Sequence, residues 1–299
     1  MNILIVGSEG FIGSHCASHF LSKDHQVIGL DLFEQSTGHY RYIKVSRLSP
    51  EFDEIFEKES FDLVINAAGS GNVPYSMQHP VSDFEANCLD TIRILDAIRK
   101  HHQHAKYIHL SSAAVYGNPE KLPVKEEDRL QPLSAYGWHK LMSEHLCREY
   151  TQIYSLKTAI LRPFSVYGEG LKKQLFWDLF QKSKQGTSVS LIGTGKESRD
   201  FIHVSDLAKA IDCISEKSPL NGEAYNLASG RETTIADAVS TFFQAMQLKP
   251  SLEFNGVTRS GDPLNWRADI SRLSHLGFVP AVDLNSGMQR VAKWMRSIQ

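Results

Sequence analysis

Short apolar runs alternate with longer amphipathic stretches through the first 165 residues of the chain. Most of these runs are apolar along their whole length and too short to be helices, so we interpret them as buried strands. Buried strands joined by helices are typical of a parallel sheet covered on both faces. The predicted strands are Ile3–Val6, Val27–Leu30, Tyr42–Val45, Leu63–Asn66, Tyr107–Ser111 and Thr158–Leu161, and the predicted helices include Ile12–Leu21, Phe84–Lys100 and Lys140–Tyr154.

The alternation stops near Pro163, and glycines divide the chain beyond it. One further apolar run, Phe201–Ile214, leads into a helix, and a less regular tail follows. We therefore predict a smaller second lobe that packs over the carboxyl ends of the strands, where ligands bind in open α/β folds. The residues that mark these joints are Gly168, Gly170, Gly193, Gly195, Pro250, Gly256, Gly261, Pro263 and Pro280.

The composition narrows the possible partners and the compartment. The 299 residues carry 32 basic and 34 acidic side chains, so no broad positive field is expected for nucleic acid or an anionic membrane. The chain opens into a strand instead of a signal peptide, and no apolar run approaches the roughly 20 residues that span a bilayer. We expect a cytoplasmic protein with reduced thiols, because its cysteines are far apart: Cys16, Cys88, Cys147 and Cys213.

A glycine-rich turn follows the first predicted strand. Gly7, Gly10 and Gly13 open the next helix, and they allow a tight turn, a close approach to a pyrophosphate and close packing of the helix on its strand. Asp31 ends the second strand, 18 residues beyond Gly13, where a carboxylate that binds the adenosine ribose is expected. Such a carboxylate repels a 2′-phosphate, so the turn predicts NAD and not NADP.

A second group of residues indicates proton transfer. The strand Tyr107–Ser111 leads into Ser112, and Tyr136 and Lys140 follow four residues apart, a spacing that puts both on one face of a helix. An ammonium beside a phenol favours the phenolate, so we expect the pKa of Tyr136 to fall from about 10 towards the working pH. The phenol can then take a proton from a substrate hydroxyl as hydride leaves the same carbon, and Ser112 can hold that oxygen.

Further motifs extend the pattern over nearly the whole chain. They are Asn66-Ala67-Ala68-Gly69, the spacing Val73…Ser76…Pro80, Asn87-Cys88-Leu89-Asp90-Thr91, the segments Leu161–Gly168 and Arg199–Val204, and Arg259-Ser260-Gly261-Asp262. Together the motifs resemble the extended short-chain dehydrogenase/reductase family, in its nucleotide-sugar epimerase/dehydratase branch.

The resemblance implies an α/β fold: a Rossmann-type, doubly wound parallel sheet that binds NAD, with a smaller C-terminal lobe for a nucleoside-diphosphate sugar. The cofactor domain would comprise residues 1–165 with a return segment at 200–227, and the substrate lobe residues 166–199 and 228–299. It also implies a homodimer built through a four-helix bundle. That bundle would contain the helix that bears Tyr136 and Lys140, together with Phe84–Lys100.

The resemblance also assigns roles to single residues. Tyr136 resembles the catalytic base, Lys140 the residue that binds the nicotinamide ribose, and Ser112 the hydroxyl that bonds the substrate oxygen. Arg199 and Arg259 resemble two arginines that clamp the diphosphate, since guanidinium matches phosphate oxygens bidentately. The other assigned positions are Gly7, Gly10, Phe11, Ile12, Gly13, Asp31, Ala67, Ala68 and Pro163 for the cofactor, and Ser165 and Asp262 for the substrate; no metal site is expected.

Three positions depart from the family pattern. Ala113-Ala114 stands where dehydratases of the family carry Asp-Glu, so a loss of water lacks its proton carriers. Ser165 occupies a position that is often Asn in the epimerases. The acidic adenine contact usually found after the third strand is not evident in Val45-Ser46-Arg47. The first departure argues against a 4,6-dehydratase, and the other two leave the substrate open.

The leading hypothesis is an NAD-dependent nucleotide-sugar 4-epimerase. Tyr136 would remove the C4 hydroxyl proton, hydride would move to NAD, and hydride would return to the other face of the 4-keto sugar. Asp31 favours this cycle, because it is redox-neutral and needs no NADPH. The alternatives are a 4-ketoreductase that completes a deoxysugar, and a non-catalytic NAD-binding scaffold, which the retained Tyr136 and Lys140 argue against. The sequence does not reveal the nucleotide base or the sugar.

Overall fold

The computed structural model describes residues 1–46, 51–186, 188–257 and 264–298. Its centre is a seven-stranded sheet in the order β10-β6-β5-β4-β1-β2-β3, in which every neighbouring pair is parallel. The predicted Rossmann-type α/β fold is therefore confirmed. The strands are β1 (Asn2–Val6), β2 (Gln26–Asp31), β3 (Arg41–Lys44), β4 (Leu63–Asn66), β5 (Lys106–Leu110), β6 (Lys157–Pro163) and β10 (Asn221–Leu227).

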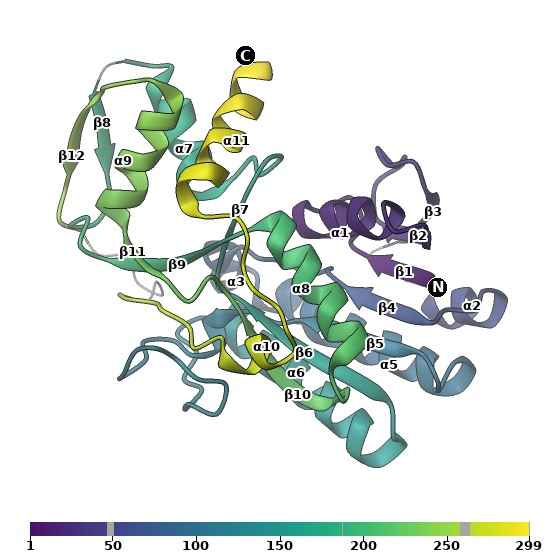
Figure 1. Cartoon of the computed structure of the whole chain (residues 1–299). Coiled ribbons are helices and arrows are strands. Elements are labelled where there is room, and N and C mark those ends of the chain that lie inside the picture. Colours follow the sequence, from purple (N-terminus) through teal and green to yellow (C-terminus); the bar gives the residue numbers. More distant parts are fainter. Residues whose placement is uncertain (47–50, 187, 258–263, 299) are drawn as a thin grey trace.

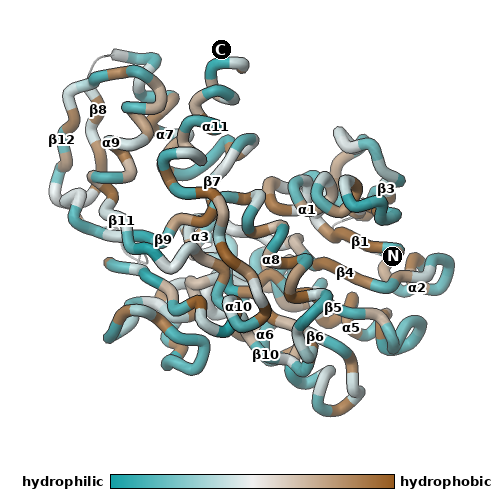
Figure 2. The backbone as a smooth tube through the Cα atoms, viewed as in Figure 1, coloured by the Kyte–Doolittle hydropathy of each residue, from teal (hydrophilic) through white to brown (hydrophobic). Residues whose placement is uncertain are grey.

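Helices cover both faces of this sheet, because successive side chains of a strand point to opposite sides. Ile3 and Ile5 of β1 pack with helices α1 and α8, whereas Leu4 and Val6 pack with α2, α5 and α6. Figure 1 shows the two helical layers, and Figure 2 shows how hydrophobic the central strands between them are. These helices are α1 (Phe11–Leu21), α2 (Phe52–Lys58), α5 (Asp90–His101), α6 (Ala135–Tyr154) and α8 (Val204–Lys217).

Two predicted helices have different bounds from those expected. The helix predicted at Phe84–Lys100 consists of α4 (Pro80–Phe84), a π-helical turn (Glu85–Leu89) and α5. A search for apolar residues at the period of an α-helix does not detect a π-helical turn, because such a turn interrupts that period. The helix predicted to begin at Lys140 begins at Ala135, because the Ser134 side chain accepts a hydrogen bond from the Gly137 amide at its amino end.

The smaller lobe contains a three-stranded sheet, β11-β9-β7, and a two-stranded sheet, β12-β8. Helices α7, α9 and α11 enclose a core with these strands that includes Phe180, Phe242 and Met288. The elements are β7 (Ser165–Tyr167), α7 (Gln174–Ser183), β8 (Ser188–Leu191), β9 (Ser198–His203), β11 (Glu232–Thr234), α9 (Ile235–Met246), β12 (Ser251–Phe254) and α11 (Leu284–Ser297). Three short elements elsewhere are α3 (Val73–Gln78), a 3-10 turn (Ala113–Val115) and α10 (Ser271–His275).

The tail is more regular than expected, because α9 and α11 are long helices that pack against each other. The residues that cap the amino ends of these two helices could have indicated them in the sequence. Thr234 Oγ1 accepts a hydrogen bond from the Asp237 amide at 3.0 Å, and Asp283 Oδ1 accepts one from the Ser286 amide at 2.8 Å. The prolines and glycines between these helices hid their amphipathic pattern.

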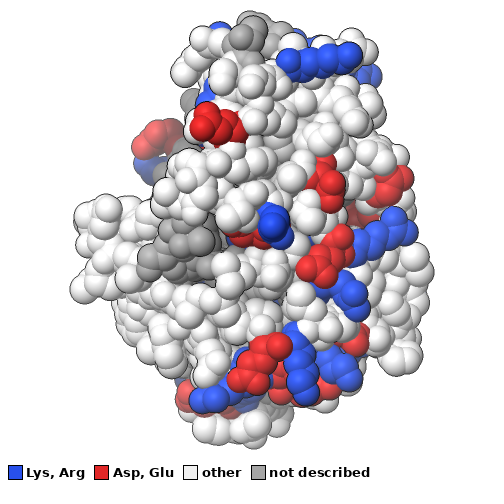
Figure 3. Space-filling model, turned by 90° about the vertical axis from the view of Figure 1, so that its left-hand side faces the viewer, with Lys and Arg blue, Asp and Glu red and all other residues white. Residues whose placement is uncertain are grey.

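The outer surface carries charges of both signs. Figure 3 shows basic and acidic side chains intermingled on the face that it presents, in keeping with a net charge of -2. Within the described part of the chain, no helix is both long enough and apolar enough to cross a bilayer.

Candidate functional site

The glycine-rich turn lies at the carboxyl end of β1 and has no room for side chains. Gly7 has a φ of +81°, and a Cβ there would lie 2.8 Å from the Ala68 amide nitrogen. A Cβ on Gly13 would lie 2.0 Å from the Gly7 carbonyl oxygen, and one on Gly10 would lie 3.1 Å from it. The backbone is therefore bare where α1 begins, which fits the approach of a pyrophosphate to a helix amino end.

Asp31 ends β2 beside this turn. One of its oxygens accepts a hydrogen bond from the Glu9 amide at 2.9 Å, and the other accepts one from the Leu32 amide at 2.7 Å. These two bonds hold the carboxylate beside the glycine turn. A carboxylate held in this way can accept hydrogen bonds from ribose hydroxyls.

The other predicted cofactor residues lie at the same edge of the sheet. Phe11 and Ile12 begin α1, directly after the glycine turn. Ala67 and Ala68 follow β4, the strand that pairs with β1, and Pro163 ends β6. All of them therefore lie at carboxyl ends of strands or at the helix amino end beside them, where open α/β sheets bind ligands.

Helix α6 brings Tyr136 and Lys140 to the carboxyl end of β5. The Lys140 ammonium donates a hydrogen bond of 2.8 Å to the carbonyl of Leu110, the last residue of β5, and lies 6.0 Å from the centroid of the Tyr136 ring. Ser112 follows β5 and forms a side-chain hydrogen bond with Tyr136, and its Oγ accepts a 3.1 Å bond from the Ala114 amide. The structure thus brings the three predicted catalytic residues together.

Two close approaches connect this cluster with the glycine turn. Ala68 lies against Gly7, as described above, and Gly69 is the next residue. A Cβ on Gly69 would lie 3.4 Å from the Lys140 ammonium nitrogen. One dipeptide therefore contacts the turn on one side and the lysine on the other, so the turn and the catalytic cluster are neighbours.

Burial controls the titration of the cluster. It raises the pKa of Tyr136, the Ser112 hydrogen bond offsets part of that rise, and the Asp83 carboxylate adds to it. Burial also lowers the pKa of Lys140 to about 8, and Asp83 is the strongest opposing influence. The expectation that Lys140 brings the Tyr136 pKa below its ordinary value is therefore wrong for the side chains of this chain, because burial is the largest influence on that pKa.

Two buried polar residues beside Lys140 were not predicted. Asp83 on α4 is fully buried; one of its oxygens lies 2.6 Å from His139 Nδ1, and the other has no hydrogen-bond partner among the described residues. Asn87 in the π-helical turn donates to the Asp83 carbonyl at 3.0 Å, while its buried Oδ1 likewise lacks a partner in the described chain and borders Gly69. The available signals for this cluster were His139, next to Lys140 in the sequence, and the motif that begins at Asn87.

A buried ion pair holds the elements that carry the catalytic residues together. Arg162 on β6 donates two hydrogen bonds to Glu144 on α6, at 2.9 and 2.7 Å, and both side chains are almost fully buried. Ser111 Oγ donates a third bond to Glu144 at 2.7 Å. Because Glu144 lies one turn beyond Lys140, and Ser111 directly precedes Ser112, this pair ties α6 to the ends of β5 and β6.

The predicted substrate residues belong to the segments of the smaller lobe. Ser165 begins β7, which pairs with β9, and Arg199 lies in β9. The Arg199 guanidinium donates to two backbone oxygens at 2.8 and 3.2 Å and lies 5.7 Å from the centroid of the Trp266 ring. Arg259 and Asp262 fall outside the described residues, so the expected pair of arginines is described for one member only.

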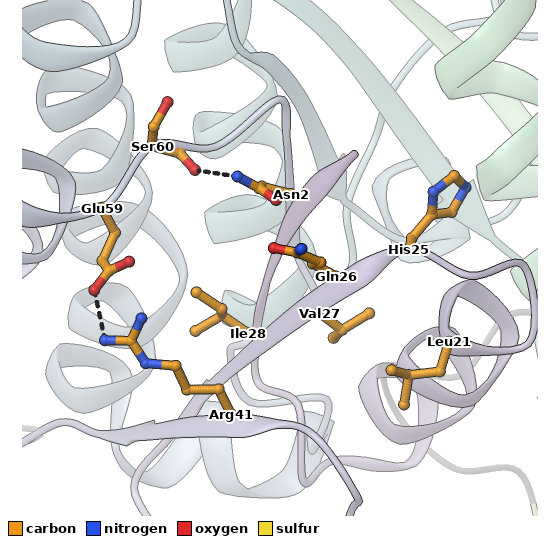
Figure 4. Close-up of a pocket in the computed structure, with 9 residues that line it drawn as sticks. All are labelled: Asn2, Leu21, His25, Gln26, Val27, Ile28, Arg41, Glu59 and Ser60. Atoms are coloured by element: carbon orange, nitrogen blue, oxygen red, sulfur yellow. Dashed lines mark hydrogen bonds and ion pairs between the residues drawn. The ribbon is translucent and has the colours of Figure 1, made fainter.

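A hollow at the opposite edge of the sheet is not the candidate site. Figure 4 shows that it lies at the amino ends of the strands, where Asn2 and Gln26 begin β1 and β2 and Arg41 begins β3. Two pairs of its lining residues bond to each other: Arg41 pairs with Glu59, and the Asn2 side chain donates to the Ser60 carbonyl. In the described part of the chain, no cluster of His, Cys, Asp and Glu is arranged to hold a metal ion.

Comparison with known proteins identifies the family. The sequence model of the NAD dependent epimerase/dehydratase family matches residues 3–228. A Methanocaldococcus jannaschii protein named "Putative UDP-glucose 4-epimerase" is 31% identical over 99% of this chain and 98% of its own length. The UDP-glucuronic acid 4-epimerase of Bacillus cereus, solved with UDP-glucuronic acid and NAD, is 26% identical, with a TM-score of 0.90 over 100% of both chains.

A second solved structure gives the same result. The UDP-glucose 4-epimerase of Thermotoga maritima, solved with UDP-glucose, is 25% identical, with a TM-score of 0.92 over 100% of this chain and 99% of its own. The family match covers the glycine turn, the Ser112, Tyr136 and Lys140 cluster and the whole seven-stranded sheet. The chain belongs to the NAD dependent epimerase/dehydratase family, as its sequence motifs predicted.

Proposed function

We propose that this protein is an NAD-dependent 4-epimerase of UDP-sugars. One observation carries the proposal: α6 holds Tyr136 and Lys140 beside Ser112, and the dipeptide Ala68-Gly69 joins this cluster to the glycine turn. The two solved relatives described above support it, because they are 4-epimerases of UDP-sugars and one of them was solved with NAD.

The residues at the glycine turn fit NAD. Bare backbone at Gly7, Gly10 and Gly13 admits the pyrophosphate at the amino end of α1, and Asp31 is held where it can accept the ribose hydroxyls. The Asp31 carboxylate also disfavours the phosphate of NADP. Bound NAD supplies the group that takes up a hydride from the sugar and gives it back.

The side chains of the protein carry the proton and hold the sugar. Tyr136 takes the proton of the C4 hydroxyl and returns it after the 4-keto sugar has presented its other face. Ser112 bonds the same oxygen. The charged form of Lys140 stabilises the phenolate. Ala113 and Ala114 provide no carboxylate near the ketone, so the sugar keeps its other hydroxyls instead of losing water.

The substrate diphosphate is proposed to bind in the smaller lobe. Arg199 supports this role, since a guanidinium on a β-strand next to an aromatic ring can bond phosphate oxygens bidentately. Ser165 lies in the neighbouring strand β7. Arg259 and Asp262 are proposed as further contacts from their sequence motif alone.

We also propose that the protein is a cytoplasmic homodimer. Helices α4 and α6 lie side by side and carry large exposed apolar side chains, among them Val81, Phe84, Trp138 and Met142. A second copy that packs α6 and the segment Phe84–Lys100, of which α5 is the main part, against the same elements would complete a four-helix bundle. All four cysteines are unpaired, as is usual for thiols in a reducing compartment.

The test is conversion of one UDP-sugar into its 4-epimer without added reductant. The purified protein is incubated separately with UDP-glucose, UDP-galactose, UDP-glucuronic acid and UDP-galacturonic acid, and the sugars are resolved by chromatography. An epimerase brings both members of one pair to the same mixture. An absolute requirement for stoichiometric NADH or NADPH would overturn the proposal and favour a 4-ketoreductase.

A further inference from the structure

The segment between β2 and β3 folds back onto the glycine turn through one side chain, Glu9. One Glu9 oxygen accepts hydrogen bonds from Ser36 Oγ at 2.7 Å and from the Tyr40 hydroxyl at 2.5 Å. The other accepts bonds from the Thr37 amide and the Thr37 hydroxyl, both at 2.8 Å. Four donors from one loop therefore converge on a carboxylate that lies between Gly7 and Gly10.

Packing supports the same closed arrangement of the loop. The Tyr40 ring lies against Gly29 of β2, where a Cβ would fall 2.2 Å from the ring carbon Cε2. The Tyr40 hydroxyl also lies 3.3 Å from the Ser8 carbonyl oxygen, in the glycine turn. Because β2 and the turn both contact Tyr40, the Tyr40 ring holds the loop against the proposed cofactor site, as Glu9 also does.

Glu9 and Asp31 place two carboxylates at the glycine turn. The Glu9 amide donates a hydrogen bond to the Asp31 carboxylate, so this bond fixes the position of the two residues relative to each other. Burial acts to raise the pKa of Glu9, but the bonds from Tyr40, Thr37 and Ser36 outweigh it and lower the pKa, so Glu9 is ionised at neutral pH.

Within the described part of the chain, the two basic side chains of β3 pair with glutamates other than Glu9. Residues 32–40 include no lysine or arginine. Arg41 pairs with Glu59, and Lys44 pairs with Glu34. The local potential is therefore negative, and burial together with Asp31 and Glu9 raises the pKa of Tyr42 to about 12.

We propose that Glu9 is a specificity-determining residue, which with Asp31 forms a two-carboxylate subsite for the adenosine end of NAD. The inference rests on the proposed function only in requiring that the glycine turn binds a dinucleotide. Glu9 acts in two ways. It holds the loop at Ser36 and Thr37 in place before the cofactor arrives, and it adds a second negative charge that opposes the 2′-phosphate of NADP.

Two substitutions separate these effects. Glu9→Gln removes the charge but keeps an oxygen for Thr37 and an amide that can donate to the Ser36 and Tyr40 hydroxyls. Glu9→Ala removes the anchor as well. Asp31→Asn and the double variant with Glu9→Gln measure whether the two charges act together, and Glu57→Gln, at an exposed position on α2, is the matched control.

The readout is the dissociation constant of each dinucleotide, measured by calorimetric titration of cofactor-free protein, so no turnover is needed. We expect Glu9→Gln to tighten NADP binding on the order of tenfold, because the variant removes the repulsion between the Glu9 carboxylate and the 2′-phosphate in a solvated site. The affinity for NAD, which lacks this phosphate, should be nearly unchanged. Glu9→Ala should weaken NAD binding by about tenfold, because the loop must then be ordered on binding. Glu57→Gln should change neither constant.

Distinct results would overturn the inference. If Glu9→Gln leaves the ratio of NADP to NAD affinity at the wild-type value while Asp31→Asn raises it, Glu9 has no role in specificity. If Glu9→Ala binds NAD as tightly as the wild type, Glu9 does not order the loop. If the wild-type protein binds neither dinucleotide, the proposed function itself is wrong, and the inference fails with it.

Discussion

The Tyr136 hydroxyl is the single group on which turnover depends in the proposed reaction. Tyr136 is partly buried, it bonds Ser112, and no other described phenol lies at this end of β5 with a lysine one helical turn away. Tyr136→Phe should therefore lower kcat by about 10²–10⁴-fold, the usual contribution of a positioned acid–base group. NAD binding should be unchanged, because the phenyl ring keeps its packing.

The control for this variant lies on the same helix. Tyr154 ends α6, eighteen residues further on and thus about 27 Å away along the axis. Tyr154→Phe removes a phenol hydroxyl from the same element without touching the catalytic cluster, so its kcat should equal that of the wild type. Full activity of Tyr136→Phe, measured with UDP-sugar and bound NAD, would show that another group is the base.

Lys140 gives the activity an alkaline limit. Burial lowers its pKa to about 8, so the ammonium is present below that pH and is lost above it. We expect kcat/KM to fall as the pH rises through about 8. Asp83 raises the pKa of both Lys140 and Tyr136, so Asp83→Asn should move the whole pH profile to lower pH.

The pH experiment distinguishes an electrostatic role from a structural one. The other titratable groups around Lys140 are Cys88, Glu144, Cys147 and His109, and all of them remain in the variant. Asp96→Asn, on α5 and paired with Arg99, is the control that should leave the profile in place. A lower rate with unchanged midpoints for Asp83→Asn would mean that Asp83 only supports the packing of α4.

At the scale of elements, the Glu144–Arg162 pair joins α6 to β6. Glu144→Met leaves a buried guanidinium without its carboxylate, which should lower the free energy of unfolding by about 3–5 kcal/mol. Arg162→Met leaves the carboxylate buried and should cost a similar amount. The double variant should recover most of the loss, because two methionines fill the space without charge.

Urea denaturation of the four proteins completes this cycle. Arg148 also pairs with Glu144 but is more exposed, so it contributes less and remains in all variants. If either single variant is as stable as the wild type, the pair is not what fixes α6. In that case the catalytic geometry must depend on the apolar contacts of the helix with the sheet.

The elements that could be predicted from the sequence are those with a local signal. Each predicted strand lies within two residues of its observed bounds, since a buried parallel strand is a continuous apolar run. The π-helical turn at Glu85–Leu89 has no such signal, because it adds one residue to a turn without changing the composition. Caps at Thr234 and Asp283 marked helices that the hydrophobic pattern alone did not reveal.

At the scale of the whole molecule, the site residues also divide into those with a local sequence signal and those without one. Gly7, Tyr136 and Lys140 were found from spacing within one element or one turn. Asp83 and Glu144 were not, because each acts through residues brought close by folding: α4 against α6, and α6 against β6. Burial of Tyr136 in the folded chain, with a smaller contribution from Asp83, raises the Tyr136 pKa instead of lowering it, and no local pattern could have predicted that.

The proposed dimer is a property of the whole molecule and can be tested by its mass. Trp138 on α6 is 49% exposed and Val81 on α4 is 70% exposed, an unusual exposure for such large apolar side chains on neighbouring helices. Burying this face would have to cover about 800 Å² on each copy to give a stable dimer. Trp138→Glu places a charge in the centre of that contact and should separate the copies.

Sedimentation equilibrium at micromolar concentration measures the outcome. The wild type should have twice the chain mass of 33.6 kDa, and Trp138→Glu should have the mass of a single chain. Val279→Glu, at an exposed position distant from α4 and α6 in the sequence, should remain a dimer. A wild-type protein that sediments as a single chain, or a Trp138→Glu variant that keeps the double mass, would mean that a second copy does not cover this face.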